Sequence, residues 1–225
     1  MTVRAIVTDI EGTTSSIAFV HEVLFPYAAE HLPGFVRTHA DDPQVAEQLD
    51  AVRREIDQDL DLDGIIDTLQ EWMDTDRKVT PLKALQGMVW TDGYRRGAFQ
   101  GHIYEDAVSG LQRWHAQGIA LYIYSSGSVQ AQKLLFAHTD AGDMTPLFSG
   151  YFDTRIGGKR EPASYQHILN EIGLPPDDVL FLSDTTEELD AAAEVGMRTR
   201  QLVRDDSVQI SGRHTTATSF DEISI

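Results

Sequence analysis

The sequence contains no cysteine and little positive charge. Without cysteine, the chain can form neither a disulfide, a thiolate metal site nor a cysteine nucleophile, so any metal must bind oxygen or imidazole. Lysine and arginine number 18 against 36 acidic residues, which gives a net charge of −18. The averaged field of such a chain repels nucleic acid and anionic membranes. A phosphate ligand would therefore need a locally positive site.

Long apolar runs are also missing, since none approaches the roughly 18 residues that a membrane helix needs. The N-terminal residues lack the basic-then-apolar pattern of a secretory signal. We therefore expect a cytoplasmic protein that binds a small molecule, contacts neither membrane nor nucleic acid, and is monomeric. Its 225 residues, 41% of them hydrophobic, suit one large domain or a domain with a sizeable insertion.

The stretch from residue 17 to about residue 100 has a helical pattern and no predicted strand. Asp42-Pro43 and Thr80-Pro81 are typical helix starts. Apolar residues follow the first start at helical spacing, namely Val45, Leu49, Val52, Ile56 and Leu60. This pattern predicts an all-helical domain over residues 17–100, inserted into a core formed by residues 1–16 and 101–225.

In the predicted core, strands alternate with helices. The apolar runs at residues 3–7, 119–124 and 179–184 predict buried strands, and residues 161–173 and 185–196 predict helices. Such alternation is typical of an α/β fold with a doubly wound, Rossmann-like parallel sheet covered by helices on both faces. The tail from Asp205 is polar, and we expect it to be loosely held.

Polar residues follow three of the predicted strands. Asp9, Ser125 and Asp184 each lie at the carboxyl end of a strand, the edge where open α/β sheets bind ligands. Gly12 lets the backbone turn beside the acids, and Ser125-Ser126-Gly127 supplies hydroxyls and an open N–H at a helix start suited to an oxyanion. Polar strand ends also arise simply because loops begin there, but the shared pattern favours a site.

Positive charge for this site can come from Lys159, which follows two glycines and precedes a helix. The alternative is that Lys159 is an ordinary solvated surface lysine. Two carboxylates, Asp9 and Asp184, with no histidine near either in sequence, suit Mg²⁺ better than zinc. Such an ion would screen the repulsion between a carboxylate nucleophile and a phosphate.

The order Asp-x-acid-Gly-Thr, strand-Ser, Lys and strand-Asp resembles the four motifs of the haloacid dehalogenase-like phosphohydrolases, over residues 9–184. A closer resemblance is to the enolase-phosphatases of methionine salvage. It rests on TDIEGTTSSIAFVHEVLFPYA (8–28), YIYSSGSVQAQKLLFAHT (122–139), GYFDTRIGGKREPASY (150–165) and FLSDTTEELDAA (181–192). Phosphatases of the wider superfamily mostly carry Asp two residues after the nucleophile, whereas this chain has Glu11, as enolase-phosphatases do.

The resemblance implies a fold and a set of catalytic roles. Asp9 would be the nucleophile that forms an aspartyl-phosphate, and the Glu11 side chain would be the general acid and then the general base. One Mg²⁺ per chain would be held by Asp9, the Glu11 backbone carbonyl and Asp184. Residues 17–100 would form a helical cap on a haloacid dehalogenase-like core.

The resemblance also assigns the phosphate-binding residues and the reaction. Ser125, Ser126 and Gly127 would bind the phosphate or the carbonyl end of the substrate, Lys159 would stabilise the anion, and Glu188 would orient Lys159 or a metal-bound water. The substrate would be 2,3-diketo-5-methylthiopentyl-1-phosphate, which is enolised and then dephosphorylated to an acireductone. The sequence does not identify the base for enolisation.

Three alternatives stay open at this point. A general sugar-phosphate phosphatase or phosphomutase of the superfamily would share Asp9, Lys159 and Asp184. A dehalogenase is less favoured, because its chemistry needs no metal-binding acid such as Asp184. A phosphoryl-accepting signalling domain combines similar residues, but it usually carries its aspartate in the middle of the chain and has no large helical insertion.

Overall fold

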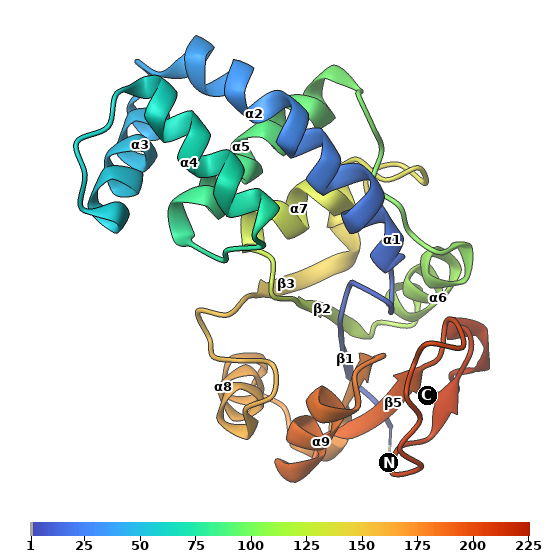
Figure 1. The fold of residues 1–225 in the computed structure, drawn as a ribbon. Coiled ribbons are helices and arrows are strands. Elements are labelled where there is room, and N and C mark those ends of the chain that lie inside the picture. The colour runs from blue at the N-terminus through green and yellow to red at the C-terminus, as the bar shows by residue number, and fades with distance from the viewer. Residues whose placement is uncertain (1) are drawn as a thin grey trace. The chain divides into compact units, whose positions relative to one another are not determined.

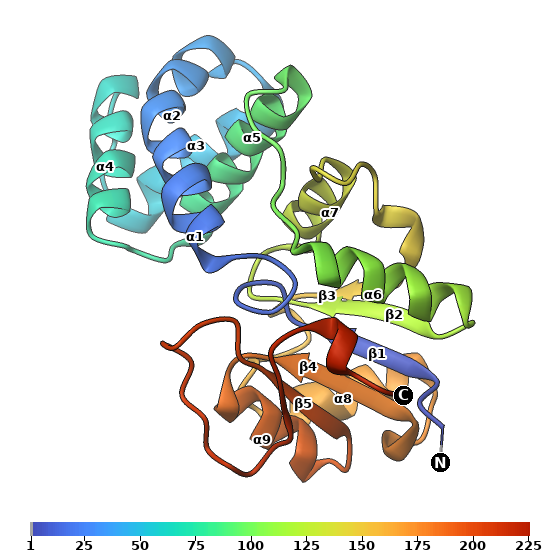
Figure 2. The same cartoon turned by 90° about the vertical axis from the view of Figure 1, so that its right-hand side faces the viewer.

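The computed structural model describes residues 2–225. The chain forms two compact units, shown in Figures 1 and 2. The first, here called the core unit, comprises the chain up to Phe19 together with Gln100–Ile225, and the second, the helical unit, comprises Val20–Phe99. Within residues 2–225, no helix is both long and apolar enough to cross a membrane.

The core unit is built on a six-stranded sheet in the order β3-β2-β1-β4-β5-β6, and every neighbouring pair is parallel. This confirms the predicted α/β fold. The strands are β1 (Ala5–Thr8), β2 (Ala120–Tyr124), β3 (Phe148–Phe152), β4 (Val179–Ser183), β5 (Arg198–Leu202) and β6 (Thr216–Ala217). Thr8 at the end of β1 lies level with Ile123 on β2 and Leu182 on β4. The carboxyl ends of these three strands therefore meet at one edge of the sheet.

Helices cover both faces of this sheet. They are α6 (Glu105–Ala116), α7 (Val129–Ala137), α8 (Pro162–Ile172) and α9 (Thr186–Glu194), and the short α1 (Ile17–Phe19) follows the first loop. Figure 2 shows α6 and α7 on one face and α8 and α9 on the other. On the second face, Val7 of β1 and Phe181 of β4 share a buried core with Ile168 of α8 and Leu189 of α9. Burial on both faces explains why β1 and β4 are continuous apolar runs.

The sequence analysis missed β3, β5 and β6, and its expectation of a loose tail is wrong for the last part of the chain. The β5 sequence RTRQL is mostly polar, and β3 contains serine and glycine, so neither has the apolar pattern of a buried strand. In the tail, Ala217 of β6 and Phe220 are buried. The Phe220 ring lies 5.3 Å from the ring of Trp114 on α6, centroid to centroid, and so ties the tail to the core.

The helical unit contains α2 (Phe25–His39), α3 (Pro43–Ile56), α4 (Leu62–Asp74) and α5 (Thr80–Arg96), preceded by a π-helical turn at Val20–Leu24. Its helices bury a core of their own, which includes Leu32, Leu49, Leu69 and Leu85. Asp42 caps α3 by accepting a bond from the backbone of Gln44, as the sequence predicts. At α5 the sequence prediction is off by one residue, because Val79 rather than Thr80 occupies the cap position.

Candidate active site

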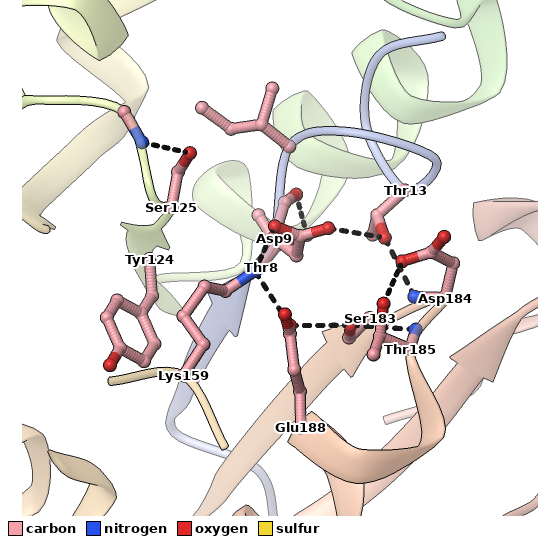
Figure 3. Close-up of polar contacts among 12 residues, drawn as sticks. Thr8, Asp9, Thr13, Tyr124, Ser125, Lys159, Ser183, Asp184, Thr185 and Glu188 are labelled. Carbon is pink, nitrogen blue, oxygen red and sulfur yellow. Dashed lines mark hydrogen bonds and ion pairs between the residues drawn. The ribbon is translucent and has the colours of Figure 1, made fainter. Parts of the chain in front are cut away.

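Asp9 lies directly after the central strand β1, and its carboxylate is held on both sides. The side chain is only 6% exposed. Its Oδ1 accepts a bond from Lys159 Nζ at 2.5 Å, and its Oδ2 accepts one from the Thr13 hydroxyl at 3.2 Å, as Figure 3 shows. The backbone N–H of Asp9 continues the sheet by donating to Leu182 at 2.9 Å. The carboxylate is therefore fixed in orientation by strand, ammonium and hydroxyl together.

A tight turn follows Asp9 at the end of β1 and packs against Asp184, which follows β4. The N–H groups of Thr13, Thr14 and Ser15 all point to the carbonyl of Ile10, at 2.8 to 3.2 Å. Gly12 has φ +74°, and a Cβ there would come 2.5 Å from Asp184 Oδ2, so glycine is required both for the conformation and for the space.

Thr13 completes this connection through its side chain. Its hydroxyl accepts a bond from the Asp184 N–H at 3.0 Å while donating to Asp9. Threonine side chains at strand ends are common, so the sequence analysis gave Thr13 no role. The sequence signal that could have identified it is its place as the threonine of the Asp-x-acid-Gly-Thr motif.

Glu11 occupies the exposed side of the same turn. Its backbone forms an isolated parallel bridge with Ser15, which fixes the direction of the turn. Glu11 is thus two residues from the buried Asp9, on a loop whose N–H groups at residues 12–15 all donate to carbonyls of the loop itself.

Lys159 is almost buried, with 9% of its side chain exposed. Its Nζ lies 2.5 Å from Asp9 Oδ1 and 2.7 Å from Glu188 Oε2. Burial by itself lowers the pKa of Lys159, but the two carboxylates outweigh burial and hold the pKa above its usual value. Lys159 is therefore a permanent ammonium in the site and not a solvated surface lysine.

The loop that carries Lys159 is fixed by hydroxyl groups that the sequence analysis did not identify. The Tyr165 hydroxyl donates to the carbonyl of Lys159 at 2.6 Å, and the Tyr124 hydroxyl donates to that of Gly157 at 2.9 Å. The Ser164 hydroxyl donates to Gly158 at 2.8 Å. Because both tyrosines lie in apolar segments, their sequence pattern indicates only core packing.

Two further carboxylates complete the site. Asp184 follows β4, where its Oδ1 accepts a bond from the Thr185 hydroxyl at 3.0 Å, and burial and the charge of Asp9 raise its pKa to about 6. Glu188 lies one turn further on, and its Oε2 accepts bonds from Lys159 and from the Ser183 hydroxyl, at 2.7 and 2.9 Å. Burial and Asp9 raise the pKa of Glu188, while Lys159 opposes the rise.

The charges of this site suit a hard divalent cation. Asp9 and Glu188 both pair with the one ammonium of Lys159, and burial together with the charge of Asp9 raises the pKa of the nearby Asp184. Among residues 2–225, no group of three or more His, Cys, Asp or Glu side chains could hold a metal. Mg²⁺ is commonly bound by one or two carboxylates and completes its shell with waters and substrate phosphate.

The Ser125-Ser126-Gly127 segment follows β2 as predicted and leads into α7. Ser125 is buried and Ser126 is exposed. The N–H of Gly127 donates to Ser125 Oγ at 3.1 Å, so the expectation of an open N–H at this glycine is wrong. Ser128 caps α7 by accepting a bond from the N–H of Ala131 at 3.2 Å.

Two buried residues that the sequence analysis missed hold this segment against β3. Gln132 Nε2 donates to the carbonyls of Gly127 and Phe152, at 2.8 Å each. Asp153 accepts a bond from the N–H of Val129 at 3.2 Å. No local sequence signal points to the contacts with Phe152 and Asp153, because they join residues 20 and 24 positions apart.

The sheet edge thus combines an oriented carboxylate, a buried ammonium, serine hydroxyls at a helix start and a pair of acids. These are the groups that phosphoryl transfer through a carboxylate nucleophile needs. Residues 3–196 match the family model for haloacid dehalogenase-like hydrolases. The fold and the site therefore define a haloacid dehalogenase-like hydrolase.

Known relatives narrow this class. The chain is 57% identical over 222 residues to Enolase-phosphatase E1 of Thioalkalivibrio sulfidiphilus, and 58% identical over 224 residues to that of Pseudomonas aeruginosa, each alignment covering 99% of both chains. The crystal structure of the UTR4 protein from Saccharomyces cerevisiae matches with a TM-score of 0.84 at 34% identity, covering 99% of this chain and all of that one.

CbbY from Rhodobacter sphaeroides, solved in complex with phosphate, matches with a TM-score of 0.61 at 16% identity over 98% of this chain and 96% of that one, and shares the fold. On the full-length identities, the chain belongs to the enolase-phosphatase family and is a phosphatase.

Proposed function

We propose that the chain is the Mg²⁺-dependent enolase-phosphatase of methionine salvage. It converts 2,3-diketo-5-methylthiopentyl-1-phosphate, by way of the enol phosphate, to the acireductone 1,2-dihydroxy-3-keto-5-methylthiopentene and phosphate. The observation that supports this most is the Asp9 carboxylate, held between the Lys159 ammonium and the Thr13 hydroxyl at the sheet edge. Family membership supplies the substrate.

In the proposed reaction, Asp9 attacks the phosphorus of the enol phosphate and becomes an aspartyl-phosphate while the bond to the leaving oxygen breaks. Glu11 donates its proton to that oxygen. The resulting Glu11 carboxylate then takes a proton from water, which attacks the phosphorus, so that phosphate leaves and Asp9 is regenerated. The exposed position of Glu11, beside a buried nucleophile, suits a group that must exchange protons with water.

The remaining site residues bind and orient the phosphate. Lys159 neutralises negative charge next to the nucleophile, and Glu188 orients Lys159 through their 2.7 Å ion pair. Ser125, Ser126 and Gly127 bind the phosphate or the carbonyl end of the substrate at the start of α7. For Gly127 to contribute its N–H, that group must leave its bond to Ser125 or share it.

Asp9, the backbone carbonyl of Glu11 and Asp184 would hold one Mg²⁺. The bound ion supplies positive charge that neutralises the transferring phosphoryl group and polarises the ketone for enolisation. The chain's own contribution is to orient the two residues, because the Thr13 hydroxyl bonds both to the Asp9 carboxylate and to the Asp184 backbone.

Residues 17–100 serve as the cap that selects the substrate. Their separate hydrophobic core supports this role, because side chains on the cap surface can vary without disturbing the catalytic sheet. The enzyme acts as a cytoplasmic monomer and binds neither nucleic acid nor membrane.

The test is phosphate release from the diketone phosphate, with and without Mg²⁺, together with ultraviolet detection of the enol. We expect both signals to require Mg²⁺ and the enol to precede phosphate. A panel of sugar phosphates serves as the comparison. Faster turnover of a sugar phosphate than of the diketone phosphate would instead assign the chain to the general phosphatases, and phosphate that stays bound to the protein would indicate a signalling domain.

A further inference from the structure

Arg204 follows β5, and its side chain is buried against the turn after Asp9. Its side chain is only 7% exposed. Its Nε and Nη2 both donate to the backbone carbonyl of Thr13, at 3.0 and 2.8 Å. Thr13 itself has no exposed surface, so in the folded protein its carbonyl makes these two bonds without competition from solvent.

The guanidinium is itself fixed from other sides. Its Nη1 donates to both oxygens of Asp106, at 2.9 and 2.8 Å, and its centre lies 4.2 Å from the centroid of the Tyr104 ring. Asp106, in the first turn of α6, also accepts a bond from the N–H of Phe220 at 2.7 Å. A planar cation held by a two-oxygen ion pair and a ring has little freedom to move.

Thr13 connects this support to the reacting groups. Its hydroxyl donates to Asp9 Oδ2 at 3.2 Å and accepts from the N–H of Asp184 at 3.0 Å. Its carbonyl is the atom that Arg204 holds. A shift of the Thr13 backbone would therefore move the nucleophile's hydrogen-bond partner and the backbone anchor of Asp184 together.

We infer that Arg204 is a positioning residue for phosphoryl transfer. It contacts no reacting atom and acts through the backbone of Thr13, setting the Asp9 carboxylate relative to Asp184. This inference rests on the proposed function, in which Asp9 is the nucleophile. Misplacing a reacting group by about 1 Å can cost roughly 100-fold in rate, so a support of this kind has a measurable effect.

The kinetic test compares Arg204→Ala and Arg204→Lys with the control Arg213→Ala. Arg213 lies in the same tail segment and pairs with Asp190 at 2.7 Å, and its side chain is 62% exposed. We expect kcat for the diketone phosphate to fall at least roughly tenfold in Arg204→Ala while KM changes less than about threefold, because the contacts to the substrate are unaltered. Arg213→Ala should retain the wild-type kcat.

Two further measurements separate positioning from a general loss of structure. Millimolar guanidinium should restore part of the kcat of Arg204→Ala and none of that of Arg204→Lys, whose ammonium still occupies the space. Hydrogen exchange at the Asp184 amide should become faster in Arg204→Ala, because its acceptor on Thr13 is no longer held, while exchange at Ile6 in the middle of β1 stays unchanged.

Each outcome decides the inference. A folded Arg204→Ala variant with wild-type kcat, or with a lower kcat but neither guanidinium rescue nor faster Asp184 exchange, overturns it. If Arg204→Ala does not fold, Arg204→Lys decides by the same kcat and exchange criteria, since one ammonium cannot reproduce the forked contacts to Thr13 and Asp106.

Asp9→Asn is measured in parallel. Turnover by Asp9→Asn refutes the proposed function, whereas an inactive Asp9→Asn with an unaffected Arg204→Ala refutes only the positioning role.

Discussion

Replacing Asp184 with asparagine should make the metal-free protein more stable, although it removes a carboxylate of the proposed Mg²⁺ site. Burial and the charge of Asp9 raise the pKa of Asp184 from 3.8 to about 6. The ionised carboxylate is therefore less favourable in the folded protein than in the unfolded chain. Asparagine has nearly the same shape, and its side-chain oxygen can still accept the bond from the Thr185 hydroxyl.

The magnitude follows from the shift. A pKa difference of 1 corresponds to about 1.36 kcal/mol, so the rise from 3.8 to about 6 corresponds to about 3 kcal/mol in the absence of screening. Asp184 is only partly buried, and solvent screening reduces this figure to about 1–2 kcal/mol. The pKa of Asp184 is higher in the folded protein than in the unfolded chain, so its ionisation lowers the free energy of unfolding. This loss of stability is absent at low pH, where Asp184 is protonated in both states. It grows as the pH rises from about 4 to about 6 and is complete above that range.

The assay is urea unfolding with a chelator present, at several pH values between 4.5 and 7.5. We expect Asp184→Asn to exceed the wild type in free energy of unfolding by about 1–2 kcal/mol at pH 7.5, and the difference to shrink as the pH falls toward 4. Asp177→Asn, at an exposed position after α8, is the control and should change stability by less than about 0.5 kcal/mol. Saturating Mg²⁺ should stabilise the wild type more than Asp184→Asn.

Equal or lower stability of Asp184→Asn at pH 7.5 without metal would refute this reasoning. It would mean that the carboxylate is well solvated or already compensated by Lys159. A stability gain that did not depend on pH would likewise show that asparagine acts through packing and not through the removed charge.

The remaining predictions concern the proposed chemistry. Asp9→Asn should fold normally by circular dichroism and release no phosphate, because an amide cannot form the acyl-phosphate; measurable turnover would disprove its role as nucleophile. Glu11→Gln should keep its Mg²⁺ affinity, since the proposed contact is a backbone carbonyl, but lose roughly 100-fold to 10,000-fold in phosphate release. Enol phosphate, detected by its ultraviolet absorbance, should then accumulate unless Glu11 also serves enolisation. Tyr165→Phe removes the 2.6 Å bond to the carbonyl of Lys159, and it should lower the free energy of unfolding by about 1–3 kcal/mol and also lower kcat. An unchanged kcat would show that the Lys159 loop holds its position without that hydroxyl.

The strands that carry the site were predictable because they are buried on both faces. β4 is fully buried along Val179–Ser183 and apolar up to Leu182, so the polar residues that end this run stand out. Asp9, Ser125 and Asp184 could therefore be placed at strand ends from the sequence. β5 could not be predicted, because only Gln201 and Leu202 of its five residues are buried.

The supports of the site could not be predicted, for a different reason. Arg204 and Tyr165 act on backbone carbonyls, of Thr13 and Lys159, and a carbonyl leaves no signature in the sequence. The Arg204 contact also joins residues 191 positions apart. Periodicity reports which face of an element is buried, and it carries no information on which distant side chain completes a loop.

The two segments of the core unit that flank the helical insertion are hydrogen-bonded to each other beside the loop after Asp9. The N–H of Tyr104 donates to the carbonyl of Thr14 at 3.0 Å, and the N–H of Ser16 donates to His102 Nδ1 at 3.0 Å. The loop after Asp9 is thus held from residues 102–104 on one side and from Arg204 on the other, all within the core unit. Because neither support includes a residue of Val20–Phe99, substitutions in the helical unit remove none of these hydrogen bonds around Asp9.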